Sequence, residues 1–125
     1  MKRGTLTIQK RKDLIAAYNR IRSAGGVNME YVSREIVIEL LIQEPAPQFY
    51  LTPRAIADDV LRYIKGKPTR NPERSKDLYE AYCRVMETTK QRKMIYVWTE
   101  VSLQPAKSFY LSRRSIRDII YGYRK

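Results

Sequence analysis

The segment KDLIAAYNR at residues 12–20 recurs as KDLYEAYCR at residues 76–84, and PAPQFYLT at residues 45–52 recurs as PAKSFYLS at residues 105–112. Two matched blocks in the same order are typical of a duplicated folding unit. The first pair lies 64 residues apart and the second pair 60 residues apart, so the second copy is four residues shorter between the blocks. We therefore predict a tandem duplication.

The proline-rich segment after Gly66 marks the boundary between the copies. We expect a first repeat over residues 1–67, which begins with a basic amino-terminal arm, and a second repeat over residues 68–125, with residues 68–74 as the linker. A unit of about 60 residues alone buries little apolar surface. We therefore expect the two repeats to pack together as one compact domain.

Apolar spacing predicts a helix at the start and at the end of each repeat. Apolar residues recur at i, i+3, i+4 and i+7 from Leu14 and again from Leu78, which is the pattern of an amphipathic helix. Thr52 and Ser112 are good N-cap residues for a later helix in each copy, and Pro53 suits the first helical position.

The middle element of each repeat leaves two structures open. The segments at about 35–42 and 95–103 are apolar and rich in β-branched residues, so both helix and strand remain possible. We favour a mainly α fold, a tandem duplication of a small three-helix unit that resembles helix-turn-helix units. The alternative is an α+β duplication with short strands at about 35–42 and 95–103.

Composition points to a polyanionic partner and away from catalysis. The chain has 25 Lys plus Arg against 13 Asp plus Glu, which gives a net charge of +12. It has no histidine and a single cysteine, so the commonest general base and the Cys-cluster zinc sites are excluded. We expect no enzymatic activity, no catalytic residues, no cofactor, no metal and no small-molecule substrate.

No apolar run approaches the roughly 20 residues that a membrane span requires. We therefore expect a cytoplasmic protein without a membrane partner.

The third helices are the predicted contact elements, because the last helix of a helix-turn-helix unit enters the major groove of DNA. Basic residues also cluster near the amino terminus and in the turn at residues 90–93. The residues predicted to bind nucleic acid are Arg54, Arg113, Arg114, Arg117, Arg124 and Lys125 on the third helices, Lys90, Arg92 and Lys93 in the turn, and Lys10 and Arg11 in the arm.

Aromatic residues before the N-caps invite a base-stacking interpretation, which we reject. An apolar pair such as Phe49-Tyr50 or Phe109-Tyr110, kept in register before a helix, is expected to anchor the entry of that helix in the core. Trp98, in contrast, is expected to be exposed.

The predicted function is non-catalytic binding of nucleic acid, double-stranded DNA rather than RNA. The alternative is a structural or adaptor protein that binds protein partners in a larger assembly, such as a virus particle or mobile-element machinery.

Overall fold

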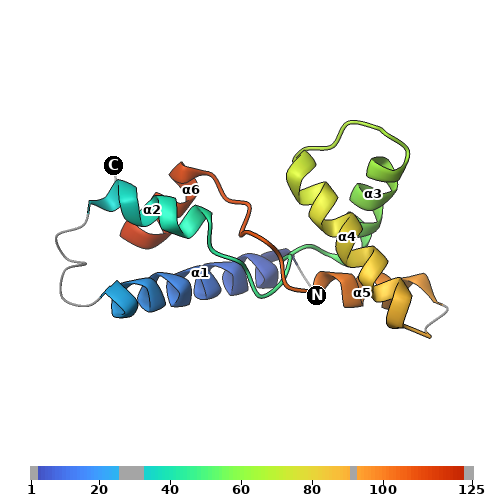
Figure 1. Ribbon diagram of the computed structural model, residues 1–125, viewed down its shortest axis with the longest axis horizontal. Helices are drawn as coiled ribbons and strands as arrows, with labels where there is room; N and C mark the ends of the chain where they lie inside the picture. The colour runs from blue at the N-terminus through green and yellow to red at the C-terminus, as the bar shows by residue number, and fades with distance from the viewer. Residues whose placement is uncertain (1–2, 26–32, 91–92, 123–125) are drawn as a thin grey trace.

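The computed structural model describes residues 3–25, 33–90 and 93–122 (Figure 1). Within these ranges the protein is mainly helical, with six helices and no β-strand beyond one isolated bridge. The helices are α1 (Arg3–Gly25), α2 (Arg34–Ile42), α3 (Pro53–Ile64), α4 (Pro72–Thr88), α5 (Met94–Ser102) and α6 (Arg113–Tyr121).

The alternative with strands in the middle segments is wrong, because both segments are helical. In α2 the Ser33 side chain accepts a hydrogen bond from the backbone N–H of Ile36 at 3.3 Å, as an N-cap does. Val37, Ile38 and Leu41 then form its buried face, a spacing that only a helix brings together.

The predicted caps of the third helices are confirmed. The Thr52 hydroxyl accepts from the N–H of Ala55 at 3.2 Å, and the Ser112 hydroxyl accepts from that of Ser115 at 3.1 Å. Gly66 follows the end of α3 with a φ of 72°, the left-handed conformation that glycine adopts without strain.

Two boundaries differ from the sequence prediction. The amino-terminal segment is not an arm, because α1 is helical from Arg3 onward. The expected linker at residues 68–74 ends early, because Asn71 caps α4 and Pro72 starts it. Most of the four-residue difference between the predicted repeats falls between their first and second helices: residues 26–33 separate α1 from α2, and residues 89–93 separate α4 from α5.

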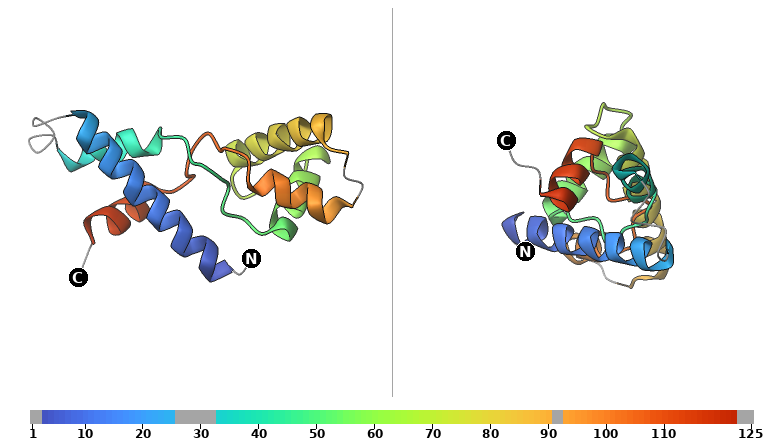
Figure 2. Two further views of the ribbon diagram at one scale, coloured as in Figure 1. Left: turned by 90° about the horizontal axis from the view of Figure 1, so that it is seen from below. Right: turned by 90° about the vertical axis from the view of Figure 1, so that its left-hand side faces the viewer.

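The helices pack as two groups of three, in an order that the chain does not follow. Helices α1, α2 and α6 pack together and form what we call the first lobe. Helices α3, α4 and α5 form the second lobe, and in the described ranges no helix of one lobe packs on a helix of the other (Figures 1 and 2). The third helix of each predicted repeat therefore packs on the first two helices of the other repeat.

Two connectors, residues 43–52 and 103–112, link the lobes and meet between them (Figure 1). Ala46 and Ala106, which occupy matched positions, exchange two backbone hydrogen bonds of 2.9 Å in an antiparallel bridge. The ring of Tyr50 stacks on that of Phe109 at 6.0 Å. Because these residues belong to one continuous core with both lobes, the molecule has a single hydrophobic interior.

The aromatic pairs before α3 and α6 lie in that core. Phe49, Tyr50 and Phe109 are buried and Tyr110 is half-buried, which confirms packing as their role. The prediction for Trp98 is wrong, because this residue is buried and stacks on Tyr82 at 5.0 Å.

Candidate nucleic-acid interface

Two of the predicted contact residues of α6 pair with carboxylates of the same lobe. Arg113 forms ion pairs with Glu39 and, at 3.7 Å, with Glu35. Arg117 pairs with Glu35 at 2.9 Å. These side chains lie on α2 and α6, so the two arginines bridge the helices at an exposed position and have part of their charge balanced there.

Arg54 and Arg114 occupy matched positions in the first turns of α3 and α6. Both are exposed and have no ion-pair partner among the described residues. Cations in a first turn lie in the unfavourable end of the helix dipole. An external anion would relieve this repulsion, so these two arginines are the third-helix residues best placed to contact phosphate.

Lys10 and Arg11 lie on α1, beside the start of α6. A pocket of about 230 Å³ is lined by both residues together with Ser115, Asp118 and Ile119 of α6. Arg11 is exposed, whereas Lys10 is half-buried. The structure therefore joins the two predicted arm residues to the third helix of the first lobe.

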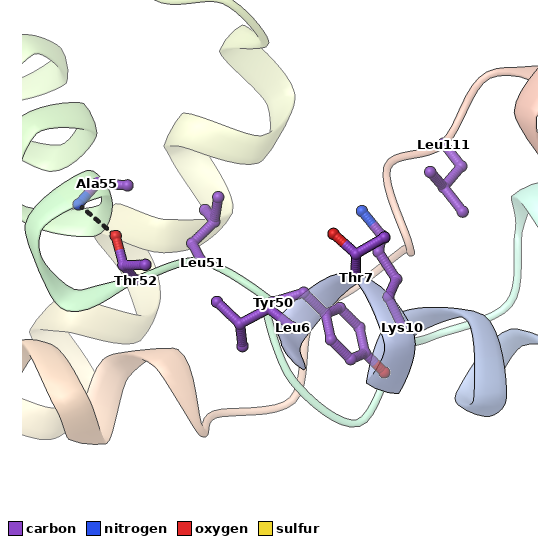
Figure 3. A pocket seen from close by; sticks show the side chains of 8 residues that line it. All are labelled: Leu6, Thr7, Lys10, Tyr50, Leu51, Thr52, Ala55 and Leu111. Atoms are coloured by element: carbon purple, nitrogen blue, oxygen red, sulfur yellow. Dashed lines mark hydrogen bonds between the residues drawn. The ribbon is translucent and has the colours of Figure 1, made fainter. Parts of the chain in front are cut away.

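Lys10 also lines a larger pocket of about 530 Å³ between α1, the first connector and the start of α3 (Figure 3). Its ammonium group lies 5.7 Å from the centre of the Tyr50 ring. Burial and, to a smaller extent, the charge of Arg74 lower the pKa of Lys10 to about 8. A bound anion would reverse this shift, because a nearby negative charge favours the ammonium form.

The remaining predicted residues lie in the second lobe or outside the described residues. Lys90 and Lys93 are exposed at the two ends of the α4–α5 turn. Arg92, Arg124 and Lys125 fall outside the described ranges. The predicted set is thus divided between both lobes and does not gather on one helix.

Sequence reasoning missed four further cations that occupy matched positions in the two repeats. Lys12 and Lys76 are matched, as are Arg20 and Arg84, and all four side chains are exposed. Arg20 forms a long ion pair of 3.5 Å with Glu44, while Lys12, Lys76 and Arg84 have no ion-pair partner in the described ranges. The sequence could have identified these residues, because they recur at matched positions although they lie off the apolar stripe and are not needed for the core.

Two matched aspartates have a structural role beside these cations. The Tyr50 hydroxyl donates to Asp13 at 2.5 Å, and the Tyr110 hydroxyl donates to Asp77 at 2.6 Å. Burial and then these hydrogen bonds raise the pKa of both tyrosines, so their hydroxyls remain protonated donors at neutral pH. The bonds tie each connector to a first helix and hold residues whose φ is near +55°.

In Asp77 the carboxylate is buried and accepts a second hydrogen bond, from the backbone N–H of Lys107 at 2.8 Å. The matched position in the first connector is Pro47, which has no N–H, and Asp13 instead accepts from the Gln9 amide at 2.9 Å. Each aspartate therefore has two donors, of different kinds.

The part of the chain that the structure describes holds no group of three or more His, Cys, Asp or Glu side chains that could bind a metal ion. Among its helices, none has the length and apolar character needed to cross a bilayer. Comparisons with protein-family models, curated proteins and solved structures gave no match.

Proposed function

We propose that this protein binds nucleic acid without catalysis, with double-stranded DNA as its ligand. The observation that carries the proposal is a set of exposed cations that occurs twice, at matched positions in a chain of net charge +12. The set consists of Lys12 and Lys76, Arg20 and Arg84, and Arg54 and Arg114. Such cations supply phosphate contacts, which dominate affinity for a duplex.

We further propose that the chain is a tandem duplication whose third helices are exchanged between the copies. Support comes from the two matched tyrosine–aspartate bonds, from the left-handed φ of both Tyr50 and Tyr110, and from the reciprocal bonds of Ala46 and Ala106. An antiparallel bridge between matched residues is the local geometry of a two-fold rotation. The matched cations would then be presented in two-fold fashion, as the antiparallel strands of DNA are.

The test is a titration of the full chain with a fluorescent DNA duplex over a series of salt concentrations. We expect the logarithm of the association constant to fall linearly with the logarithm of salt concentration. No binding at low salt, or affinity that does not depend on salt, would refute the proposal. An RNA duplex of the same sequence is expected to bind more weakly.

Two double variants assign the contacts, and each removes two positive charges. R54A/R114A removes two unpaired arginines and is expected to lower the salt slope by about 1.8, because each phosphate contact contributes about 0.9. R113A/R117A removes the two arginines that pair with α2 and is expected to leave the slope nearly unchanged. Equal slopes for both variants would place the interface elsewhere.

A specific observation supports the alternative of an adaptor or structural protein. Several large apolar side chains of the second lobe are exposed, among them Leu61, Ile64 and Ile95. Exposed apolar side chains that gather in one patch are typical of protein interfaces.

A further inference from the structure

The two lobes differ most where the third helix meets the second helix. In the first lobe the side chains at this junction are polar or aromatic. The Arg22 guanidinium lies 5.7 Å from the Tyr18 ring centre, Tyr18 contacts Tyr121 edge to face at 6.1 Å, and the Arg34 guanidinium lies 4.6 Å from the Tyr121 ring centre. Glu35 adds its ion pairs to Arg113 and Arg117.

In the second lobe the matched positions are apolar. Met86 replaces Arg22, Leu61 replaces Tyr121, Met94 replaces Arg34 and Ile95 replaces Glu35. Their side chains are 41% to 56% exposed, and Ile64, one turn beyond Leu61 on α3, is 52% exposed. We call these five residues the apolar seam: Leu61, Ile64, Met86, Met94 and Ile95.

The matched contacts of the first lobe indicate that the apolar seam is contiguous. The Arg34 guanidinium lies over the ring of Tyr121, and Tyr121 contacts the ring of Tyr18. The Arg22 guanidinium lies over the ring of Tyr18. By correspondence of sequence positions, Met94 is expected beside Leu61 in the second lobe, and Leu61 beside Tyr82 and Met86. Helices α3, α4 and α5 pack on one another, as this placement requires.

Folding does not require an apolar seam at these positions. The first lobe also packs its three helices on one another, with arginine, glutamate and tyrosine at these positions. Exposed apolar side chains without a folding role are typical of a protein interface. Methionine is unbranched and polarisable, so two methionines give the seam a surface that adapts to a partner.

The charges around the apolar seam determine which partner fits. On α3, Arg54, Asp58 and Lys65 lie on the same stripe as Leu61, at i, i+4 and i+11 against i+7, so this stripe carries two cations and one carboxylate. Lys90 and Lys93 stand at the turn before α5. These four cations are exposed and have no ion-pair partner among the described residues, whereas Asp58 and Glu87 are the nearest exposed carboxylates on α3 and α4.

We propose that the apolar seam is the docking site for an amphipathic helix of a partner protein that carries acidic residues beside its apolar stripe. The stripe packs on the seam between α3 and α5, and the carboxylates face the four cations. This inference does not depend on nucleic-acid binding. Arg54, Lys90 and Lys93 belong to both candidate surfaces, so the test is read on Met86 and Met94, which the nucleic-acid proposal does not use.

The test uses methionine-methyl NMR of the full chain, because the protein has four methionines and two of them lie in the seam. The probe is a synthetic helical peptide with leucines at i, i+3, i+4 and i+7 and glutamates on its other face. Saturable shifts of the Met86 and Met94 signals are expected, with Met1 and Met29 unchanged.

Two control peptides test the chemistry of the partner. A peptide with lysines in place of the glutamates and a scrambled peptide without a continuous apolar stripe are both expected to leave the spectrum unchanged. The proposal is overturned if the acidic peptide causes no shift, or if all three peptides cause the same shift. Seam signals that move with protein concentration alone would indicate a second copy of the chain and would also overturn it.

Two variants test whether the peptide binds the apolar seam or any exposed apolar surface. M86Q/M94Q removes two seam side chains without adding charge and is expected to weaken peptide binding at least tenfold. I8Q/I15Q removes two exposed apolar side chains of α1, 57% and 42% exposed, and is expected to bind the peptide as the wild type does. Equal affinities of the two variants would refute the assignment, and thermal unfolding checks that both are folded.

Discussion

The first and second lobes each consist of three helices that pack on one another, but their surface chemistry differs. Both use a tyrosine–aspartate bond to hold a connector, and both cap the third helix with a hydroxyl. They differ at the seam, which carries ion pairs of Arg113 and Arg117 in the first lobe and exposed apolar side chains in the second. What the lobes share therefore serves the fold, and what differs determines which surface each lobe offers.

The largest expected effect concerns the shared feature. Asp77→Ala leaves the Tyr110 hydroxyl and the Lys107 N–H without their acceptor in a buried position, which should lower the free energy of unfolding by about 3 kcal/mol. Asp13→Ala, at a half-buried position, should lower it by about 1–2 kcal/mol. Urea unfolding measures both values, and a larger loss for Asp13→Ala would contradict the difference in burial.

The second prediction uses two matched cations that should respond in opposite directions. Arg74 pairs with Asp59 at 3.3 Å, and the side chains are only 22% and 11% exposed. The position of Asp59 is taken by Ile119 in the first lobe, and Lys10 forms no ion pair among the described residues, although Asp118 lines the same pocket. Arg74→Met should therefore destabilise the protein by about 2 kcal/mol, because Asp59 loses its partner.

Lys10→Met should instead stabilise the protein by about 1 kcal/mol at pH 7, because it removes a cation from a partly desolvated site. The folded pKa of about 8 lies below the unfolded value of 10.5, so the wild type should gain stability as pH rises from about 8 to 10.5. Thermal unfolding across this pH range should show the rise in stability for the wild type, and the rise should be absent in the Lys10→Met variant. The same pH dependence in both proteins would argue against Lys10 as its source.

The smallest effect concerns the polar seam of the first lobe. A double-mutant cycle of Glu35→Ala and Arg117→Ala should give a coupling energy of about 0.5–1 kcal/mol, as expected for an exposed pair. The coupling should decrease in 1 M salt, because salt screens exposed charges. Glu100→Ala with Arg62→Ala, two exposed and unpaired residues of the second lobe, serves as the control pair and should show no coupling.

Sequence patterns predicted the helices better than their partners. The apolar stripes from Leu14 and Leu78 and the caps at Thr52 and Ser112 are local signals, and each is confirmed. The packing of α3 on α4 and α5, and of α6 on α1 and α2, was not predictable, because the matched segments carry similar stripes. A stripe shows which face of a helix is buried but not which helix covers it.

The same reason explains why the ion pairs of Arg113 and Arg117 were not predicted. Their partners Glu39 and Glu35 lie 74 and 82 positions away in the chain, so no helical spacing could reveal the pairs. Position alone made these arginines candidates for DNA contact. The unpaired Arg54 and Arg114 were predicted by the same argument and remain candidates.

The order of the helices along the chain has a mechanical consequence. The second lobe is one uninterrupted stretch, residues 53–102, while the first lobe is completed only by α6 near the end of the chain. During synthesis the second lobe can therefore fold before α6, the last helix of the first lobe, has been made. A force applied between α1 and α6 would act first on the contacts within the first lobe. It would reach the second lobe only after α6 had separated from α1 and α2.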